Sequence, residues 1–193
     1  MADPARRRMT VDEFYALPPE ELEGNPELID GELVYRSHAR MRHGSSQGRF
    51  VRVLADLDPY DPDAPGWWIV VEQDWRLNTR NILVPDVAGW RRERLPEVVE
   101  GPIEIRPDWV CELVSPGHES HDLKFKSRVY REHEVPWYWT VFPESGLVQV
   151  FQNAGPTWTL HGTYAVGEKA RIPPFEELEI VLDHLFLPPL KNR

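Results

Sequence analysis

The sequence predicts an α/β (α+β) fold in which a mixed β-sheet is flanked by helices. Two short apolar runs, residues 82–88 and 109–114, are each interrupted by one acid, a pattern typical of strands buried on both faces. Apolar residues recur at helical spacing within residues 43–57. The 19 prolines in 193 residues disfavour a bundle of long helices, because proline breaks helix interiors.

The chain is expected to form a single domain over residues 10–190, preceded by a flexible N-terminus of residues 1–9. No apolar run approaches the roughly 18 residues of a membrane helix, and no apolar segment follows the basic start as in a secretory signal. The one cysteine, Cys111, cannot form an internal disulfide, which fits a reducing cytosol. We therefore expect a cytoplasmic protein with no membrane partner.

Local signals define the first two elements. Residues 10–13, TVDE, form a capping box ahead of an apolar group, so a short helix is expected there, ending before Pro18. Residues 27–35, ELIDGELVY, predict a hairpin that turns at Asp30-Gly31, because both residues tolerate a positive φ.

The rest of the chain alternates predicted helices and strands. Spacing and turn residues predict a helix over 43–57, a loop over 58–66 and a second helix from Ser120 to about Glu134. Strands are expected over 67–73, 74–77, 82–88, 109–114, 135–142, 147–152 and 157–160. A short strand or helical turn is expected in the tail after residue 172. Residues 91–108 read as a polar connection. This order indicates helices packed on a mixed sheet.

Charge is unevenly distributed along the chain. The 32 acids against 22 basic residues give a net charge of −10, which argues against non-specific coating of DNA. Residues 36–55, however, hold no acid, and they contain the candidate phosphate contacts Arg40, Arg42, Arg49 and Arg52, together with Arg36. The plain alternative is a set of solvated helix and loop positions.

Two carboxylates stand in apolar strands. Asp86 is expected to share a strand face with Ile82, Val84 and Ala88, and Glu112 lies within WVCELV. A carboxylate buried there is costly unless it is paired, hydrogen-bonded or bound to a metal. Two such groups on neighbouring strands would make a hard-oxygen site for Mg²⁺ or Mn²⁺.

Glu27 could supply a third oxygen to this site or orient a water. The alternative for each acid is a strand-end position that accepts a hydrogen bond from the backbone or from an arginine.

Lys126 is the predicted basic partner of these acids. On the expected helix it shares a face with Tyr130, four residues on, whose ring should pack inward. Lys124 is the competing lysine, and it projects from a different face of that helix. The alternative role for Lys126 is a helix-surface pair with Asp122.

Several fragments in order resemble one protein family. They are PELIDGELVYR (26–36), His43 at the start of a helix, VPDVA (84–88), WVCELVSP (109–116) and HDLKFKSRVYREHEVPWYWTVFP (121–143). Together they are similar to the Uma2 family (DUF820), which is assigned to the PD-(D/E)xK nuclease-like superfamily. The resemblance runs from Thr10 to Pro189.

The resemblance implies a restriction endonuclease-like core with catalytic positions at Glu27, Asp86, Glu112 and Lys126, and a metal at Asp86 and Glu112. The common superfamily form has its lysine two residues after the glutamate, where this chain has Val114. The family often has Gly, Glu and Asp where Glu134, Trp137 and Phe142 stand here. The resemblance further implies that His43 lies near the site, touching phosphate or orienting Glu27, with a surface histidine as the alternative.

The remaining features indicate other roles. His118 and His121 lack cysteine partners at zinc spacing. Cys111 alternates away from Glu112 and should lie in the core. Trp137 and Trp139 share a strand face and could form a base-stacking platform, core or a subunit interface, and a homodimer is expected.

These patterns predict a Mg²⁺-dependent (or Mn²⁺-dependent) endonuclease acting on nucleic acid, with DNA the favoured partner. The alternative is a catalytically silent member of the same fold that serves as a binding or oligomerisation module, which leaves open whether the chain is an enzyme. A third hypothesis, a carbohydrate- or small-molecule-binding β protein, rests on the eight tryptophans alone.

Overall fold

A six-stranded sheet forms the centre of the computed structural model, which describes residues 8–24, 26–35, 41–61, 63–114 and 122–188. Its strand order is β10-β9-β8-β7-β6-β3. Only β7 and β8 pair in parallel, and the other neighbours are antiparallel, so the sheet is mixed as predicted. The strands are β3 (Trp67–Val71), β6 (Val87–Arg91), β7 (Trp109–Leu113), β8 (Trp137–Phe142), β9 (Leu147–Asn153) and β10 (Trp158–Ala165).

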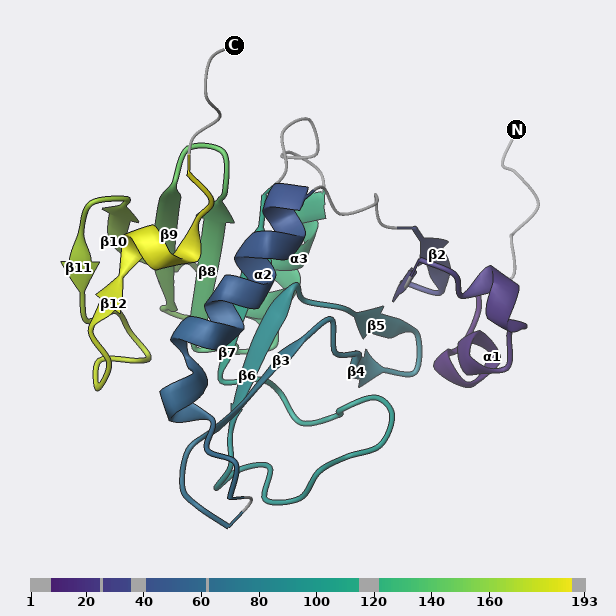
Figure 1. Ribbon diagram of the computed structural model, residues 1–193. Helices are drawn as coiled ribbons and strands as arrows, with labels where there is room; N and C mark the ends of the chain where they lie inside the picture. The colour runs from purple at the N-terminus through teal and green to yellow at the C-terminus, as the bar shows by residue number, and fades with distance from the viewer. Residues whose placement is uncertain (1–7, 25, 36–40, 62, 115–121, 189–193) are drawn as a thin grey trace.

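Two helices cover opposite faces of this sheet (Figure 1). The helices are α2 (Met41–Val53), followed by the 3₁₀ helix η2 (Ala55–Leu57), and α3 (Asp122–Glu132), which connects β7 to β8. Neighbouring residues of β7 point to the two faces in turn. Cys111 packs in the cluster that contains Phe50 of the first helix, α2, and Val110 packs in the cluster that contains Tyr130 of the second helix, α3. Ser120, the expected N-cap of α3, lies outside the described residues.

A smaller sheet of order β2-β1-β5-β4 carries the N-terminal part of the chain. The capping box is present, since the Thr10 hydroxyl accepts from the Glu13 backbone N–H and the Glu13 carboxylate accepts from that of Thr10. The predicted hairpin turns at Asp30 (φ 50°) and Gly31 (φ 79°). The elements are α1 (Val11–Tyr15), η1 (Pro19–Glu21), β1 (Glu27–Ile29), β2 (Glu32–Val34), β4 (Trp75–Asn78) and β5 (Asn81–Leu83).

The single strand predicted over residues 82–88 is wrong. The chain leaves β5 at Leu83 and enters β6 at Val87, so the two halves belong to different sheets. Pro85 has no N–H to continue a ladder, and side chains bind both backbone groups of Val84 in place of a neighbouring strand. Ile82 and Val84 therefore pack in the N-terminal cluster and Ala88 in the α3 cluster, and Asp86 shares no strand face with them.

The C-terminal segment packs against α2 and one face of the large sheet. It holds β11 (Lys169–Ala170), β12 (Ile180–Val181) and η3 (Leu182–Leu185). The short strand or helical turn expected after residue 172 is therefore present. Leu182, Leu185 and Phe186 are buried in the cluster that contains Phe50. This segment therefore belongs to the core.

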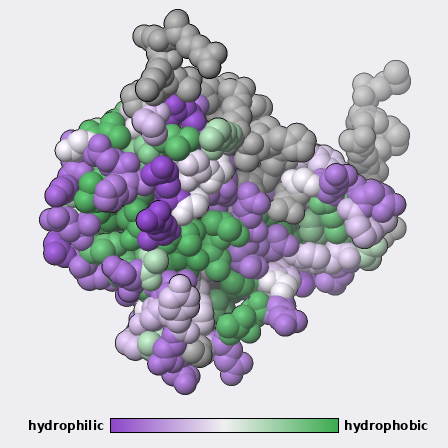
Figure 2. Space-filling view, viewed as in Figure 1, coloured by the Kyte–Doolittle hydropathy of each residue, from purple (hydrophilic) through white to green (hydrophobic). Residues whose placement is uncertain are grey.

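The tryptophans build the core. Five of the eight are at most 2% exposed (Trp67, Trp75, Trp90, Trp109 and Trp139), and the other three are partly buried. Trp139 is fully buried, so it cannot form a stacking platform with Trp137, and most of the tryptophans that suggested a carbohydrate-binding protein belong to the core. Figure 2 shows hydrophilic side chains over much of the viewed face, with hydrophobic ones gathered toward its centre. None of the helices in the described ranges is long and apolar enough to cross a bilayer.

Candidate active site

The predicted site residues come from four elements that meet where β5 ends and β6 begins. Glu27 is the first residue of β1, Asp86 precedes β6, Glu112 lies in β7 and Lys126 lies in α3. All four side chains are buried, with at most 6% of each residue exposed. The fold therefore buries three acids and one base in a small region.

Lys126 joins two of the acids. Its Nζ lies 2.9 Å from Oε1 of Glu27 and 3.2 Å from Oε1 of Glu112, and it also donates to the carbonyl oxygen of Val84 at 3.2 Å. Lys124, the competing lysine, is exposed. The choice of lysine from the helix face thus agrees with the geometry.

Glu27 is partnered on one oxygen only. Its Oε1 accepts from the backbone N–H of Val84 at 2.7 Å, in addition to the contact with Lys126. Its Oε2 is buried and has no hydrogen-bond partner in the described part of the chain. Such an oxygen is costly without a donor or a cation beside it.

Asp86 is held against β7 and α2. Its Oδ2 accepts from the backbone N–H of Leu113 at 2.7 Å, one residue after Glu112. Its Oδ1 lies 3.3 Å from Nε2 of His43, on the first turn of α2. His43 was expected at Glu27 or at a phosphate, and in this structure it lies against Asp86.

Tyr130 completes the environment of Glu112. Its hydroxyl donates to Oε1 of Glu112 in a short hydrogen bond. Burial, and then the charges of Glu112 and Glu27, raise the pKa of Tyr130 well above its ordinary value, so the hydroxyl keeps its proton and remains a donor. The sequence predicted that this ring packs inward, but not that it binds Glu112.

Cys111 lies on the face of β7 opposite to Glu112 and is fully buried, as expected for a core residue. Burial, followed by the charges of Asp86 and Glu112, raises the pKa of its thiol. A thiolate nucleophile is therefore disfavoured at this position.

The residue types fit a hard divalent cation. Carboxylate oxygens suit Mg²⁺ and Mn²⁺, and the unpartnered Oε2 of Glu27 would gain a counter-charge. Across the described ranges, no three His, Cys, Asp or Glu side chains stand close enough together to hold an ion as they are placed. The ammonium of Lys126 is the positive charge that Glu27 and Glu112 share in this structure.

The predicted phosphate contacts have different surroundings. Arg40 lies outside the described residues. Arg42 donates to the carbonyl oxygens of Leu187 and Pro188 and pairs with Glu144 at 3.3 Å, so it ties the C-terminal segment to α2.

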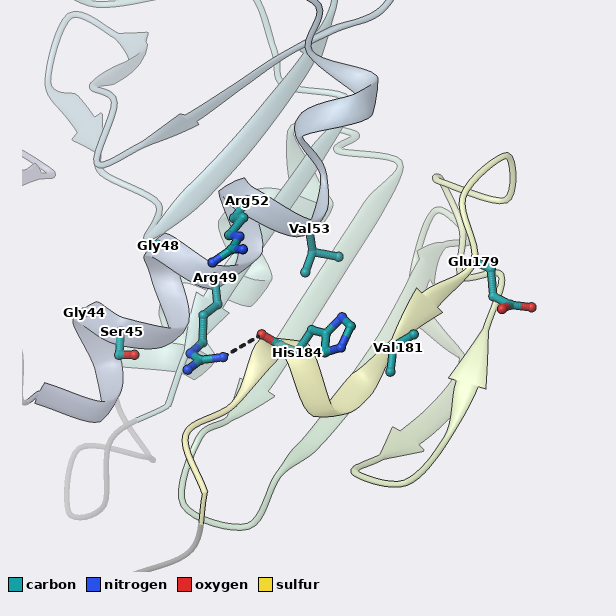
Figure 3. A pocket seen from close by; sticks show the side chains of 9 residues that line it. All are labelled: Gly44, Ser45, Gly48, Arg49, Arg52, Val53, Glu179, Val181 and His184. Carbon is teal, nitrogen blue, oxygen red and sulfur yellow. Dashed lines mark hydrogen bonds between the residues drawn. The ribbon is translucent and has the colours of Figure 1, made fainter.

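Arg49 and Arg52 line a cavity of about 600 Å³ between α2 and the C-terminal segment. Figure 3 shows the guanidinium group of Arg49 reaching His184, whose carbonyl oxygen accepts from it at 3.2 Å. Arg52 is exposed. Gly44, Ser45 and Gly48 line the same cavity along α2, which leaves the helix surface open there.

Comparison with known proteins identifies the family. The Uma2 family model, described as "Putative restriction endonuclease", matches residues 11–183. Among solved structures, a DUF820 protein from Anabaena variabilis, described as a "putative nuclease", is similar with a TM-score of 0.69 and 23% identity, over 92% of this chain and 97% of that chain. Among curated proteins, none matches.

The structural likeness shows the fold, and the predicted mixed α+β, restriction endonuclease-like core is confirmed. The family match covers most of the chain, from α1 to η3. It therefore includes all four predicted site residues, and the chain belongs to the Uma2 family.

Proposed function

We propose that this protein is an endonuclease that uses Mg²⁺ or Mn²⁺ to hydrolyse phosphodiester bonds of nucleic acid, with DNA as its substrate. The observation that carries the proposal is the buried ammonium of Lys126, held 2.9 Å from Glu27 and 3.2 Å from Glu112, beside the strand that follows Asp86. Buried ionisable groups of opposite charge that gather in one place mark a candidate functional site. Membership of a restriction endonuclease family supports the reaction class.

Asp86 and Glu112 would hold the metal ion, with Glu27 contributing from across the site. When bound, a divalent ion supplies a Lewis acid that polarises a phosphoryl oxygen and lowers the pKa of water. Tyr130 fixes the Glu112 carboxylate, and the Leu113 N–H and His43 fix that of Asp86. These contacts leave few orientations open to the two carboxylates.

Lys126 is assigned to the attacking water or to the charge that grows on the phosphoryl group. Its ammonium carries three donors, and the surrounding burial strengthens their effect because the local dielectric is low. Val84 and the two glutamates hold the ammonium in place. All three donors are therefore engaged in this structure, and a metal ion on Glu112 would free the donor that Glu112 accepts here.

Nucleic acid would approach along α2. Arg49 and Arg52 are the proposed phosphate contacts. Arg42 is engaged by two carbonyls of the C-terminal segment and by Glu144, whereas Arg49 makes one hydrogen bond to that segment and Arg52 is exposed. A homodimer would present two sites to the two strands of a duplex, and light scattering of the purified protein tests that part of the proposal.

The direct test is nicking of supercoiled DNA with Mg²⁺ or Mn²⁺ by the wild type, by Asp86→Ala and by Asp56→Ala. Asp56 is exposed, on η2, and serves as the matched control. We expect activity in the wild type and the control, and its loss in Asp86→Ala. Equal activity in all three proteins would contradict the assignment.

A second candidate is a catalytically silent module for binding or oligomerisation. It is favoured by the pairing of Lys126 with both glutamates, which also satisfies the needs of a purely structural network. Calorimetric titration with Mn²⁺ separates the two functions. Binding that Glu112→Gln weakens supports the enzyme, whereas no binding, or binding that Glu112→Gln leaves unchanged, supports the silent module.

A further inference from the structure

Gln47 links α2 to the chain break that carries Asp86. It lies one turn after His43 and is 9% exposed. Its Nε2 donates to the backbone carbonyl of Asp86 at 3.0 Å and to Oε1 of Glu72 at 3.2 Å. One buried amide therefore connects the predicted metal ligand to a second carboxylate, which the sequence patterns did not single out.

Glu72 follows β3 directly, at the end nearest the break. Its backbone N–H also donates to the carbonyl of Asp86, at 3.4 Å, so both its backbone and its side chain are tied to this segment. Glu72 is exposed, whereas Asp86 is buried, and the Glu72 carboxylate shares the Gln47 amide with the backbone carbonyl of Asp86.

The backbone of Glu72 is in the left-handed region, with φ 50°. Glycine would adopt this conformation without strain. Positive φ by itself does not mark a site, because Glu134 has φ 59° just after α3, where its backbone N–H closes the helix on the carbonyl of Arg131. What distinguishes Glu72 is the Gln47 amide that holds its carboxylate.

We propose that Gln47 and Glu72 are positioning residues of the metal site. Gln47 fixes the Asp86 segment and holds the Glu72 carboxylate at the outer side of the site, where it accepts hydrogen bonds from the hydration shell of an ion held by Asp86. Mg²⁺ and similar ions keep several waters when bound to proteins, and outer partners of this kind change metal affinity about 10–100-fold. The inference rests on the proposed metal-dependent function.

The test compares two glycine substitutions at positive φ. Calorimetric titration with Mn²⁺ and thermal unfolding are measured for the wild type, Glu72→Gly and Glu134→Gly. Both substitutions relieve a left-handed non-glycine residue, so we expect neither to lower the melting temperature. We expect Glu72→Gly alone to raise the Kd for Mn²⁺, by about tenfold or more.

Glu72→Gln separates charge from backbone conformation, since it keeps the side-chain size and should weaken Mn²⁺ binding as Glu72→Gly does. We expect Gln47→Met to weaken Mn²⁺ binding in the same way. In the double variant Gln47→Met with Glu72→Gln, the Kd for Mn²⁺ should rise by less than the product of the two single increases, because both substitutions act through one contact.

The outcomes separate this inference from the proposed function. A wild type that binds Mn²⁺ and a Glu72→Gly variant with a Kd within about twofold of it would overturn the positioning role and leave the proposed function standing. A wild type that binds no Mn²⁺ would overturn both. Fully multiplicative losses in the double variant would overturn the link between Gln47 and Glu72.

Discussion

Replacing Lys126 by Met should destabilise the protein strongly when no metal is present. Lys126 is 2% exposed, and its ammonium is the shared partner of Glu27 and Glu112. Methionine has a similar length and flexibility, so the substitution removes the charge without opening a large cavity. The two glutamates would then face each other's negative charge in the interior.

Removing one partner of a buried ion pair typically costs about 3–5 kcal/mol. Both glutamates keep one donor, the Val84 N–H for Glu27 and the Tyr130 hydroxyl for Glu112, so the lower end, about 3 kcal/mol, applies here. In a chain of 193 residues, 1 kcal/mol corresponds to roughly 2–4 °C in melting temperature. The expected decrease is therefore about 6–12 °C.

Thermal unfolding followed by circular dichroism in EDTA at neutral pH measures this decrease. Lys124→Met is the matched control, because Lys124 is exposed on the same helix and its loss should change stability by no more than about 0.5 kcal/mol. Glu27→Gln added to Lys126→Met should recover part of the loss. If Lys126→Met melts together with Lys124→Met, the ammonium does not stabilise the cluster and the reasoning fails.

Three further predictions concern the rest of the fold. Glu134→Gly should raise the free energy of unfolding in urea by about 0.5–1 kcal/mol, because Glu134 has φ 59°, which glycine adopts without strain. At this position the N–H groups of Glu134 and Val135 close the end of α3 on the carbonyls of Arg131 and Tyr130. Stability should fall as the pH rises above about 10. The pKa of Tyr130 is raised in the folded state, so the folded state binds the hydroxyl proton more tightly than the unfolded state does. Constant stability from pH 9 to 11 would contradict this. Arg92→Met should speed chymotryptic cleavage after the exposed Tyr60 in the 58–66 loop. The buried Arg92 side chain binds the Asp58 carboxylate and the carbonyls of Pro59, Asp61 and Ala64, and these contacts would be lost.

The fold was predictable wherever the signal is local. The capping box at Thr10 and the turn at Asp30-Gly31 depend on residues at most three positions apart, and both form as expected. Pro85 is a local sign that a ladder is interrupted, but the break between β5 and β6 also depends on Val84, whose partners Glu27 and Lys126 are 57 and 42 residues away. Periodicity within a window of ten residues cannot register such partners, so the two strands read as one.

The site was predictable in residue type but not in pairing. Buried acids stand out in apolar strands, and the helix face selects Lys126 over Lys124. Gln47 carries no such signal, since a glutamine in an amphipathic helix is ordinary. Arg42 looked like a phosphate contact because it lies in a basic stretch, but its carbonyl partners lie 145 and 146 residues later in the chain.

In the proposed function the charges that decide nucleic-acid binding are buried, so the net charge of −10 is a poor guide to it. With Glu27, Asp86 and Glu112 ionised and Lys126 protonated, the cluster carries a formal charge of −2, summed as three negative charges and one positive. A phosphodiester brings a further negative charge, and repulsion is strong where the dielectric is low. A divalent cation brings the cluster to neutrality, so metal and phosphate binding should support each other at this site. The surface acids, being solvated and screened by salt, contribute little to that balance.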